Sequence, residues 1–152
     1  MTYYGGKELA DSFRTVRKNT LVVAEEIPEA QFDFRAVPEV RSVAEMLSHI
    51  AVSASRHYEM HAVNGVTTFE GFDWIAFMEK WKQEEQRLRT KSQILDALRQ
   101  TGKEWASWLE GLPEDFLSAQ VRLSPQATPS SKSRFELLLS VKEHEMHHRA
   151  QL

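Results

Sequence analysis

The sequence predicts an all-α protein: a four-helix bundle with a long crossover, containing a shorter helix, between the second and third long helices. Three observations favour this fold. Apolar residues recur at spacings of three and four in four long segments, no stretch keeps the alternation of a strand, and about 28 residues separate the second segment from the third. A connection of that length is too long for a tight turn. Because 152 residues suit one domain, we expect a single domain over residues 1–152.

The first helix is predicted by one apolar face and ends at Pro28, because proline lacks the amide hydrogen that a further turn needs. That face comprises Leu9, Phe13, Val16, Thr20, Val23 and Ile27. Residues 28–41 contain two prolines among polar and aromatic residues. We therefore expect an irregular connection there, anchored by Phe32 and Phe34.

The second helix begins with a capping box, in which the Ser42 hydroxyl and the Glu45 carboxylate each satisfy an amide at the helix start. We expect this helix to run to about Val63, before an Asn-Gly pair, and residues 66–72 to form a loop. A shorter, charge-rich helix within the crossover is then predicted by the spacing of Trp74, Phe77, Trp81 and Leu88.

The third long helix is predicted to start at Ser92, a favourable N-cap residue, and to end at Gly111 and Pro113. Its apolar face comprises Leu95, Leu98, Trp105, Leu109 and Leu112. A polar connection rich in Ser, Pro and Gln follows, without a strand pattern. Residues 133–136 (Ser-Arg-Phe-Glu) form a second capping box, so the fourth helix should begin near Arg134.

The composition excludes several classes of function. A net charge of -3 offers no basic surface for phosphate backbones, so we expect no nucleic-acid partner. No apolar run approaches the roughly 20 residues that span a bilayer. The N-terminus has no signal-peptide pattern, so we expect a cytoplasmic protein with no membrane partner. The chain has no cysteine, so any thiol chemistry must use a small-molecule thiol.

Three of the six histidines lie within five positions near the C-terminus. Residues four apart share one face of a helix, so His144 and His148 could bind one metal ion through two imidazoles. A third ligand should come from a neighbouring helix, and His49 is the best candidate, since small residues around it would leave space for a ligand. Small residues equally allow two helices to pack closely, so both interpretations stay open.

Other assignments of the histidines are possible. His57 and His61 are four apart and could form a chelate of their own. Each lies roughly 80 to 120 degrees around the helix from His49, however, so we expect both to be exposed. His147 could replace His148, but its spacing from the first histidine is less favourable, and we expect it beside the site or at the surface.

Residues 144–148 (His-Glu-Met-His-His) also match the H-E-x-x-H pattern of metallopeptidases, in which two histidines bind zinc and the glutamate is a general base. No strand pattern in this sequence could hold a peptide in extended form. We therefore disfavour a peptidase and expect Glu145 to lie on the helix surface.

Three neutral imidazoles would leave a coordination position open for water or substrate, which is typical of catalytic metal sites. Imidazole suits zinc, nickel, iron and copper, so the ligands do not identify the metal. Such a metal could acidify a bound water or hold an exogenous thiol as thiolate. Arg56, on the same stripe as His49, is a candidate partner for an anionic substrate, although an arginine on a long helix is more often a solvated surface residue.

Residues 42–50 (Ser-Val-Ala-Glu-Met-Leu-Ser-His-Ile), with His-Glu-Met-His-His-Arg-Ala-Gln at 144–151, resemble the DinB/YfiT-like family of metal-dependent enzymes. The resemblance covers nearly the whole chain. It implies a four-helix bundle with a long crossover between the second and third helices and an open metal site, whose ligands carry over onto His49, His144 and His148. This sequence has alanine where the family often has glycine after the arginine.

Thiol-dependent relatives transfer or isomerise small molecules with bacillithiol, mycothiol or glutathione, and many members have no known reaction. The resemblance therefore implies a transferase or hydrolase with a small-molecule substrate, a divalent zinc, nickel or iron ion, and a low-molecular-weight thiol. The alternative is a non-catalytic bundle that binds a metal or ligand for sensing or storage. A bundle with spare apolar stripes could readily form a homodimer.

Overall fold

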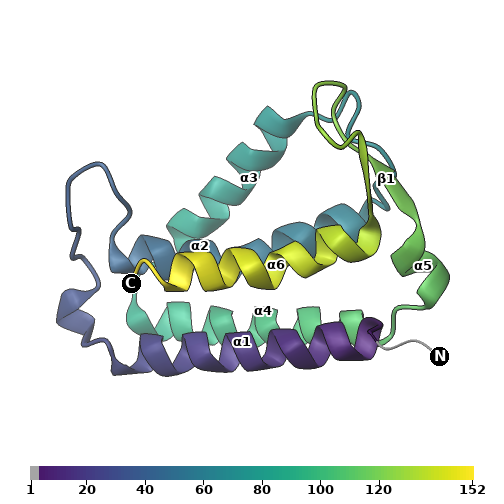
Figure 1. Cartoon of the computed structure of the whole chain (residues 1–152). Coiled ribbons are helices and arrows are strands. Elements are labelled where there is room, and N and C mark those ends of the chain that lie inside the picture. The colour runs from purple at the N-terminus through teal and green to yellow at the C-terminus, as the bar shows by residue number, and fades with distance from the viewer. Residues whose placement is uncertain (1–3) are drawn as a thin grey trace.

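Four long helices form the body of the protein in a computed structural model that describes residues 4–152 (Figure 1). They are α1 (Gly6–Glu26), α2 (Val43–Tyr58), α4 (Lys91–Glu110) and α6 (Arg134–Arg149). Helices α1 and α2 each pack against both α4 and α6. The predicted all-α four-helix bundle is therefore confirmed. Among the residues described, no helix combines the length and hydropathy that crossing a bilayer requires.

The helix starts follow from side chains that cap the first free amides. The predicted capping boxes at Ser42 and Ser133 are both present. For α4 the predicted N-cap Ser92 is wrong, because the Thr90 hydroxyl accepts from the Gln93 amide, and the Gln93 side chain accepts from the Thr90 amide. This box starts the helix two residues earlier and places Ser92 inside its first turn.

The connection after α1 contains a short 3-10 helix, Glu29–Gln31, and is held to the body at only one of the two predicted aromatic residues. Phe32 is buried in a cluster with Leu47 and Ile94. Phe34 is 58% exposed, so the expectation that it anchors the connection is wrong. Here its backbone carbonyl, rather than its ring, contacts the bundle by accepting from the Val43 amide.

The crossover contains the expected shorter helix, α3 (Trp74–Arg87), which Asp73 caps. A π-helical turn, Glu59–Val63, continues α2 to the start of the crossover, so the second helical segment ends at the predicted position. Gly65 has a φ of 56 degrees, the left-handed conformation that glycine adopts without strain. Helix α3 packs on α2 and leans away from the bundle at its N-terminal end (Figure 1).

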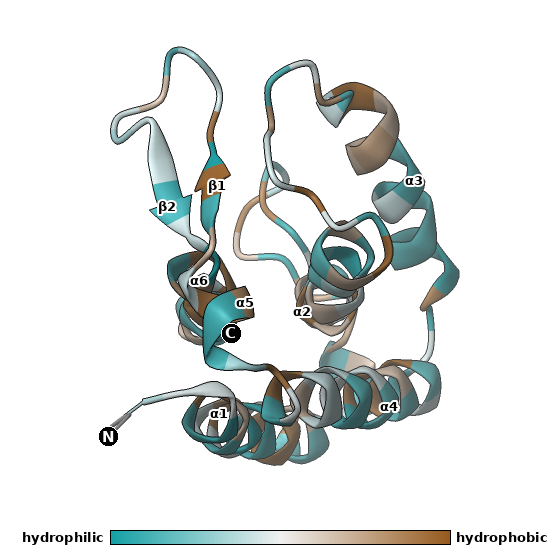
Figure 2. Ribbon diagram, turned by 90° about the vertical axis from the view of Figure 1, so that its right-hand side faces the viewer, coloured by the Kyte–Doolittle hydropathy of each residue, from teal (hydrophilic) through white to brown (hydrophobic). Residues whose placement is uncertain are grey.

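Two short strands and one short helix between α4 and α6 lie outside the sequence-based expectation. Helix α5 (Glu114–Ser118) is followed by β1 (Gln120–Arg122), which pairs antiparallel with β2 (Ser131–Ser133). Three residues are too few to show a strand's alternation, and five too few to show a helical face. Figure 2 shows the hairpin and α3 standing on the same side of the molecule, beyond α2 and α6 and opposite α1 and α4.

The buried side chains form three clusters among the described residues. One cluster joins α1, α4 and α6 around Phe13 and Trp105. A second joins α2 and α4 around Leu47 and Leu98. The third lies beneath α3 and the hairpin and comprises Met60, Val66, Phe69, Phe77 and Val121. The α2 stripe that carries His49 therefore faces both α6 and the space below α3.

Candidate metal centre

The three histidines predicted from the sequence meet between α2 and α6. His49 lies in the middle of α2 and is 6% exposed, whereas His144 and His148 lie one turn apart on α6. The His144 Nε2 atom is 3.1 Å from His49 Nε2 and 3.1 Å from His148 Nε2. One ring nitrogen from each residue therefore faces a common point, and these atoms all lie within 4.8 Å of one another.

The spacing of the Nε2 atoms suits a divalent ion. A tetrahedral zinc ion holds imidazole nitrogens at roughly 2.0–2.1 Å, which places two such nitrogens about 3.3 Å apart. The two measured separations from His144 Nε2 are close to that value. No other group of three or more His, Cys, Asp or Glu ligand atoms of this kind occurs within residues 4–152.

Each ring is also oriented by a contact at its other nitrogen, Nδ1. An acceptor at Nδ1 holds the proton there and leaves the Nε2 lone pair free for a metal. The partners are Glu85 Oε1 for His49 at 2.6 Å, Gln151 Oε1 for His148 at 2.8 Å and the Ser53 hydroxyl, which can either accept or donate, for His144 at 3.3 Å. The contacts of His49 and His148 favour the tautomer whose Nε2 lone pair is free for a metal.

Burial also keeps two of these imidazoles neutral. Loss of solvent around His144 lowers its pKa to about 3, with smaller contributions from neighbouring histidines and Arg56. The pKa of His148 is lowered mainly by burial too, although its hydrogen bond with Gln151 opposes the change. A neutral imidazole is the form that binds a metal, so these two residues need lose no proton at neutral pH.

A family model described as the DinB superfamily matches residues 12–152, which include both helices of the histidine site. The chain belongs to the DinB superfamily. Its fold is similar to the crystal structure of an uncharacterized protein from Clostridium difficile 630, with a TM-score of 0.67 over 99% of this chain and 96% of that chain. The identity is 13%, so this likeness shows the fold alone. No curated protein matches.

Three residues that support the rings in this DinB superfamily protein were missed in the sequence. Ser53 lies one turn after His49 on the same stripe of α2, and Gln151 belongs to the final motif, so the position of each in the sequence indicated a place near the histidines. Nothing in the sequence indicated that Glu85 lies there. It is one of several acidic residues on the charge-rich helix α3, and only the packing of α3 on α2 brings it to His49.

We expect Glu85→Ala to weaken Zn²⁺ binding by about 10- to 100-fold, the usual effect of removing the partner that orients a ligating histidine. The carboxylate fixes the His49 tautomer and raises the basicity of the imidazole. Competition with a chromogenic chelator measures the affinity. Glu84→Ala is the matched control, because Glu84 lies on the same helix and pairs with Arg87. Equal affinities of the two variants would show that Glu85 does not support the site.

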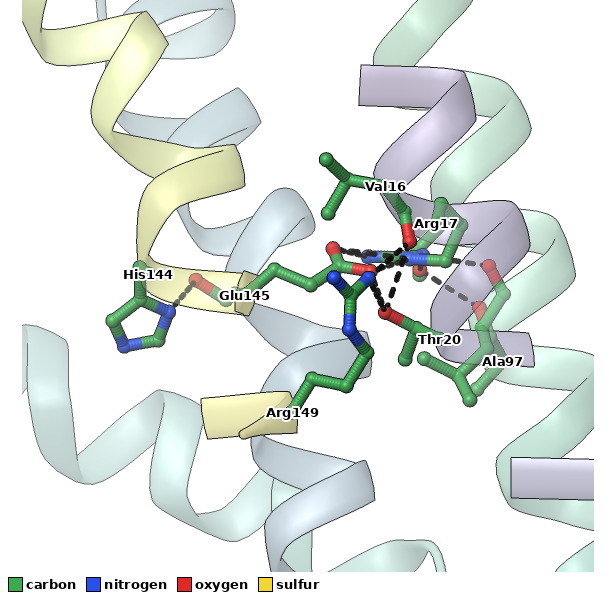
Figure 3. A network of polar contacts seen from close by, with 10 residues as sticks. Val16, Arg17, Thr20, Ala97, His144, Glu145 and Arg149 are labelled. Atoms are coloured by element: carbon green, nitrogen blue, oxygen red, sulfur yellow. Dashed lines mark hydrogen bonds and ion pairs between the residues drawn. The ribbon is translucent and has the colours of Figure 1, made fainter. Parts of the chain in front are cut away.

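Glu145 does not face the histidines, and the expectation that it lies on the helix surface is wrong. It is 2% exposed, and its carboxylate accepts hydrogen bonds from Arg17 Nε at 2.9 Å, Arg17 Nη2 at 3.0 Å and Thr20 Oγ1 at 2.7 Å. Figure 3 shows this side chain leaving α6 on the opposite side from His144. A metallopeptidase glutamate must reach a water on the metal. This geometry therefore argues against a peptidase.

The remaining histidines take other positions in this DinB superfamily protein. His147 is exposed and its Nε2 lies 3.4 Å from Gln151 Nε2, in agreement with the expectation of a place beside the site or at the surface. The expectation that His61 is exposed is wrong, because it is 1% exposed where the π-helical turn lies beneath the following loop. The same expectation is wrong for His57, which is half-buried and whose ring stacks on that of His61 with centroids 6.0 Å apart.

Proposed function

We propose that this DinB superfamily protein is a metal-dependent enzyme that acts on a small molecule, with a divalent ion held by His49, His144 and His148. The observation that carries the proposal is the convergence of three imidazole rings, two of which have an acceptor oxygen at Nδ1 and therefore a free Nε2 lone pair. A purely structural zinc site is closed by four protein ligands. Three ligands leave a position for water or a substrate atom.

The residues of the chain prepare this site in two ways. Burial keeps the His144 imidazole neutral, and the acceptor oxygens at Nδ1 of His49 and His148 leave the Nε2 lone pairs of these two rings free. When bound, a zinc, nickel or iron ion would supply a Lewis acid that lowers the pKa of a coordinated water or thiol. Because the chain has no cysteine, a thiol substrate must be a small molecule. Thiol-dependent transfer and hydrolysis are therefore the reactions that we propose.

The proposal is tested first by the metal content of protein purified without a histidine tag. We expect about one equivalent of a divalent metal per chain, because residues 4–152 include one group of three side chains that could hold an ion. Elemental analysis measures it. A metal content far below one equivalent, with no gain in thermal stability on adding Zn²⁺, Ni²⁺ or Fe²⁺, would contradict the metal site.

The reaction is tested with the metal-loaded protein and a panel of low-molecular-weight thiols, each combined with an epoxide, a haloalkane or an activated ester. We expect turnover that depends on the metal and falls to the background rate in His148→Ala, which removes a ligand. His147→Ala, an exposed histidine on the same helix, should keep the activity. Stoichiometric metal without turnover on the panel would favour the alternative, a bundle that binds metal for sensing or storage.

A further inference from the structure

Arg56 is a buried cation that no carboxylate contacts directly among residues 4–152, although the charge of Glu85 attracts it from a greater distance. It is 9% exposed, and its closest polar contacts are Ser53 Oγ at 3.5 Å and the Met78 sulfur at 4.0 Å. Within residues 4–152 it forms no salt bridge, whereas the similarly buried Arg17 is paired with Glu145. Because an unpaired charge is costly to bury, Arg56 is placed to receive an anion.

The Arg56 side chain lines a cavity of about 520 Å³ between α2, α3 and the hairpin. This volume lies within the range of small-molecule binding sites. The walls beside Arg56 are mainly apolar and include Phe69, Trp74 and Met78. Its lining contains no aspartate or glutamate. The cavity therefore combines one cation with a surface that favours an apolar body.

Two histidines also line this cavity and have buried ring nitrogens without a partner in residues 4–152. His61 is 1% exposed, and neither of its ring nitrogens has a hydrogen-bond partner among the described residues. The Nδ1 atom of His57 likewise has none there. Buried polar atoms in proteins are almost always hydrogen-bonded, so these unpartnered nitrogens are an exception that lies next to the cavity. Burial lowers the pKa of His61 to about 4, and its neutral ring can both donate and accept.

The cavity also adjoins the histidine site. The Ser53 hydroxyl oxygen is 3.5 Å from Arg56 Nη2 and 3.3 Å from His144 Nδ1, so one side chain separates the guanidinium from a metal-binding ring. Residues 49, 53 and 56 follow one face of α2, and residue 60 in the π-helical turn continues that face from the histidine site to the cavity. A molecule held by Arg56 would therefore lie beside the metal centre.

We propose that Arg56 binds the carboxylate of a small molecule whose apolar or aromatic body fills this cavity. The planar guanidinium offers two parallel hydrogen bonds to a carboxylate, and the body packs against Phe69 and Trp74. Amphipathic carboxylates would then be the substrate class of the proposed enzyme. That they are substrates, and not only ligands, rests on the proposed function. The binding itself does not need the metal.

Isothermal titration calorimetry of the metal-free protein tests this proposal with matched ligands. The probes are phenylacetate, 3-phenylpropionate and 4-methylpentanoate, each compared with its neutral primary amide. We expect at least one carboxylate to bind at least tenfold more tightly than its amide. If no carboxylate of the three binds, or if carboxylate and amide bind equally, the proposal is wrong.

The role of Arg56 is tested with Arg56→Met, which keeps an apolar stem and removes the charge. We expect it to lose at least tenfold in carboxylate affinity while binding the amide as before. Arg56→Lys should retain part of the preference, because it keeps the charge but not the two parallel donors. Arg41→Met is the control, since Arg41 is an exposed arginine that lies outside the cavity lining. Equal losses in Arg56→Met and Arg41→Met would overturn the assignment.

Thermal unfolding separates this role from a structural one. Removing an unpaired buried cation should leave the Tm of Arg56→Met unchanged or higher. A lowered Tm would show that Arg56 is compensated within the protein and would count against the proposal. The titration is repeated in His144→Ala, where we expect the carboxylate preference to remain. If instead the unmodified protein binds no metal but keeps the carboxylate preference, the carboxylate site stands and only the metal-dependent function is refuted.

Discussion

Replacing Glu145 with alanine is expected to lower the free energy of unfolding by roughly 3–5 kcal/mol, the usual cost of removing one partner of a buried ion pair. The Arg17 and Glu145 side chains are only 5% and 2% exposed. The variant would leave the guanidinium in the core with no counter-charge. A typical domain has a total stability of about 5–15 kcal/mol, so the variant should lose a large part of it. Urea denaturation followed by circular dichroism measures the change.

Two further variants control this experiment. Glu143→Ala removes an exposed glutamate from the same helix and should change the stability by less than about 0.5 kcal/mol. The double variant Arg17→Met with Glu145→Leu leaves no unpaired charge and should recover most of the loss. If Glu145→Ala were no less stable than Glu143→Ala, the ion pair would not stabilise the bundle as its burial indicates.

Replacing His144 with alanine is expected to weaken Zn²⁺ binding by roughly 100- to 1,000-fold. Structural zinc binding by four ligands amounts to about 10–16 kcal/mol, or about 3–4 kcal/mol for each ligand, and each 1.4 kcal/mol is a factor of ten in affinity. His144 is the central member of the group, with both other Nε2 atoms 3.1 Å from its own. Its loss should therefore leave only two ligands for the ion, His49 on α2 and His148 on α6.

The matched control for His144→Ala is His147→Ala, which removes an exposed imidazole from the same helix. Chelator competition should give this variant the affinity of the unmodified protein. His147→Ala should also keep the rise in Tm that Zn²⁺ produces, because a ligand that binds only the folded state stabilises it. If both variants bound Zn²⁺ equally well, the three-histidine centre would be the wrong assignment.

The long helices were predictable because periodicity and caps act locally. One apolar face and Pro28 define α1, and the serine capping boxes define the starts of α2 and α6. The start of α4 was misplaced because Thr90 and Ser92 are both good caps, and only the partner residue Gln93 distinguishes them. The short hairpin was missed because each of its strands has three residues, too few to show the alternation of a strand.

The candidate site was only partly predictable, because local patterns place some of its residues and tertiary packing places others. The spacing of His144 and His148 follows from helix geometry, whereas Glu85 reaches His49 only through the packing of α3. The burial of Glu145 did leave a signal. With Leu138 and Val141 it continues a stripe at spacings of three and four, which marks the face of α6 that meets α1.

Helix α3 carries parts of two sites at once. Near its C-terminal end Glu85 holds the His49 ring, and near its N-terminal end Trp74 and Met78 form one wall of the Arg56 cavity. Any shift of this helix on α2 therefore changes both sites together. Such coupling is reciprocal: by whatever factor an ion at the histidines raises the affinity of the cavity for its ligand, that ligand raises the affinity for the ion by the same factor.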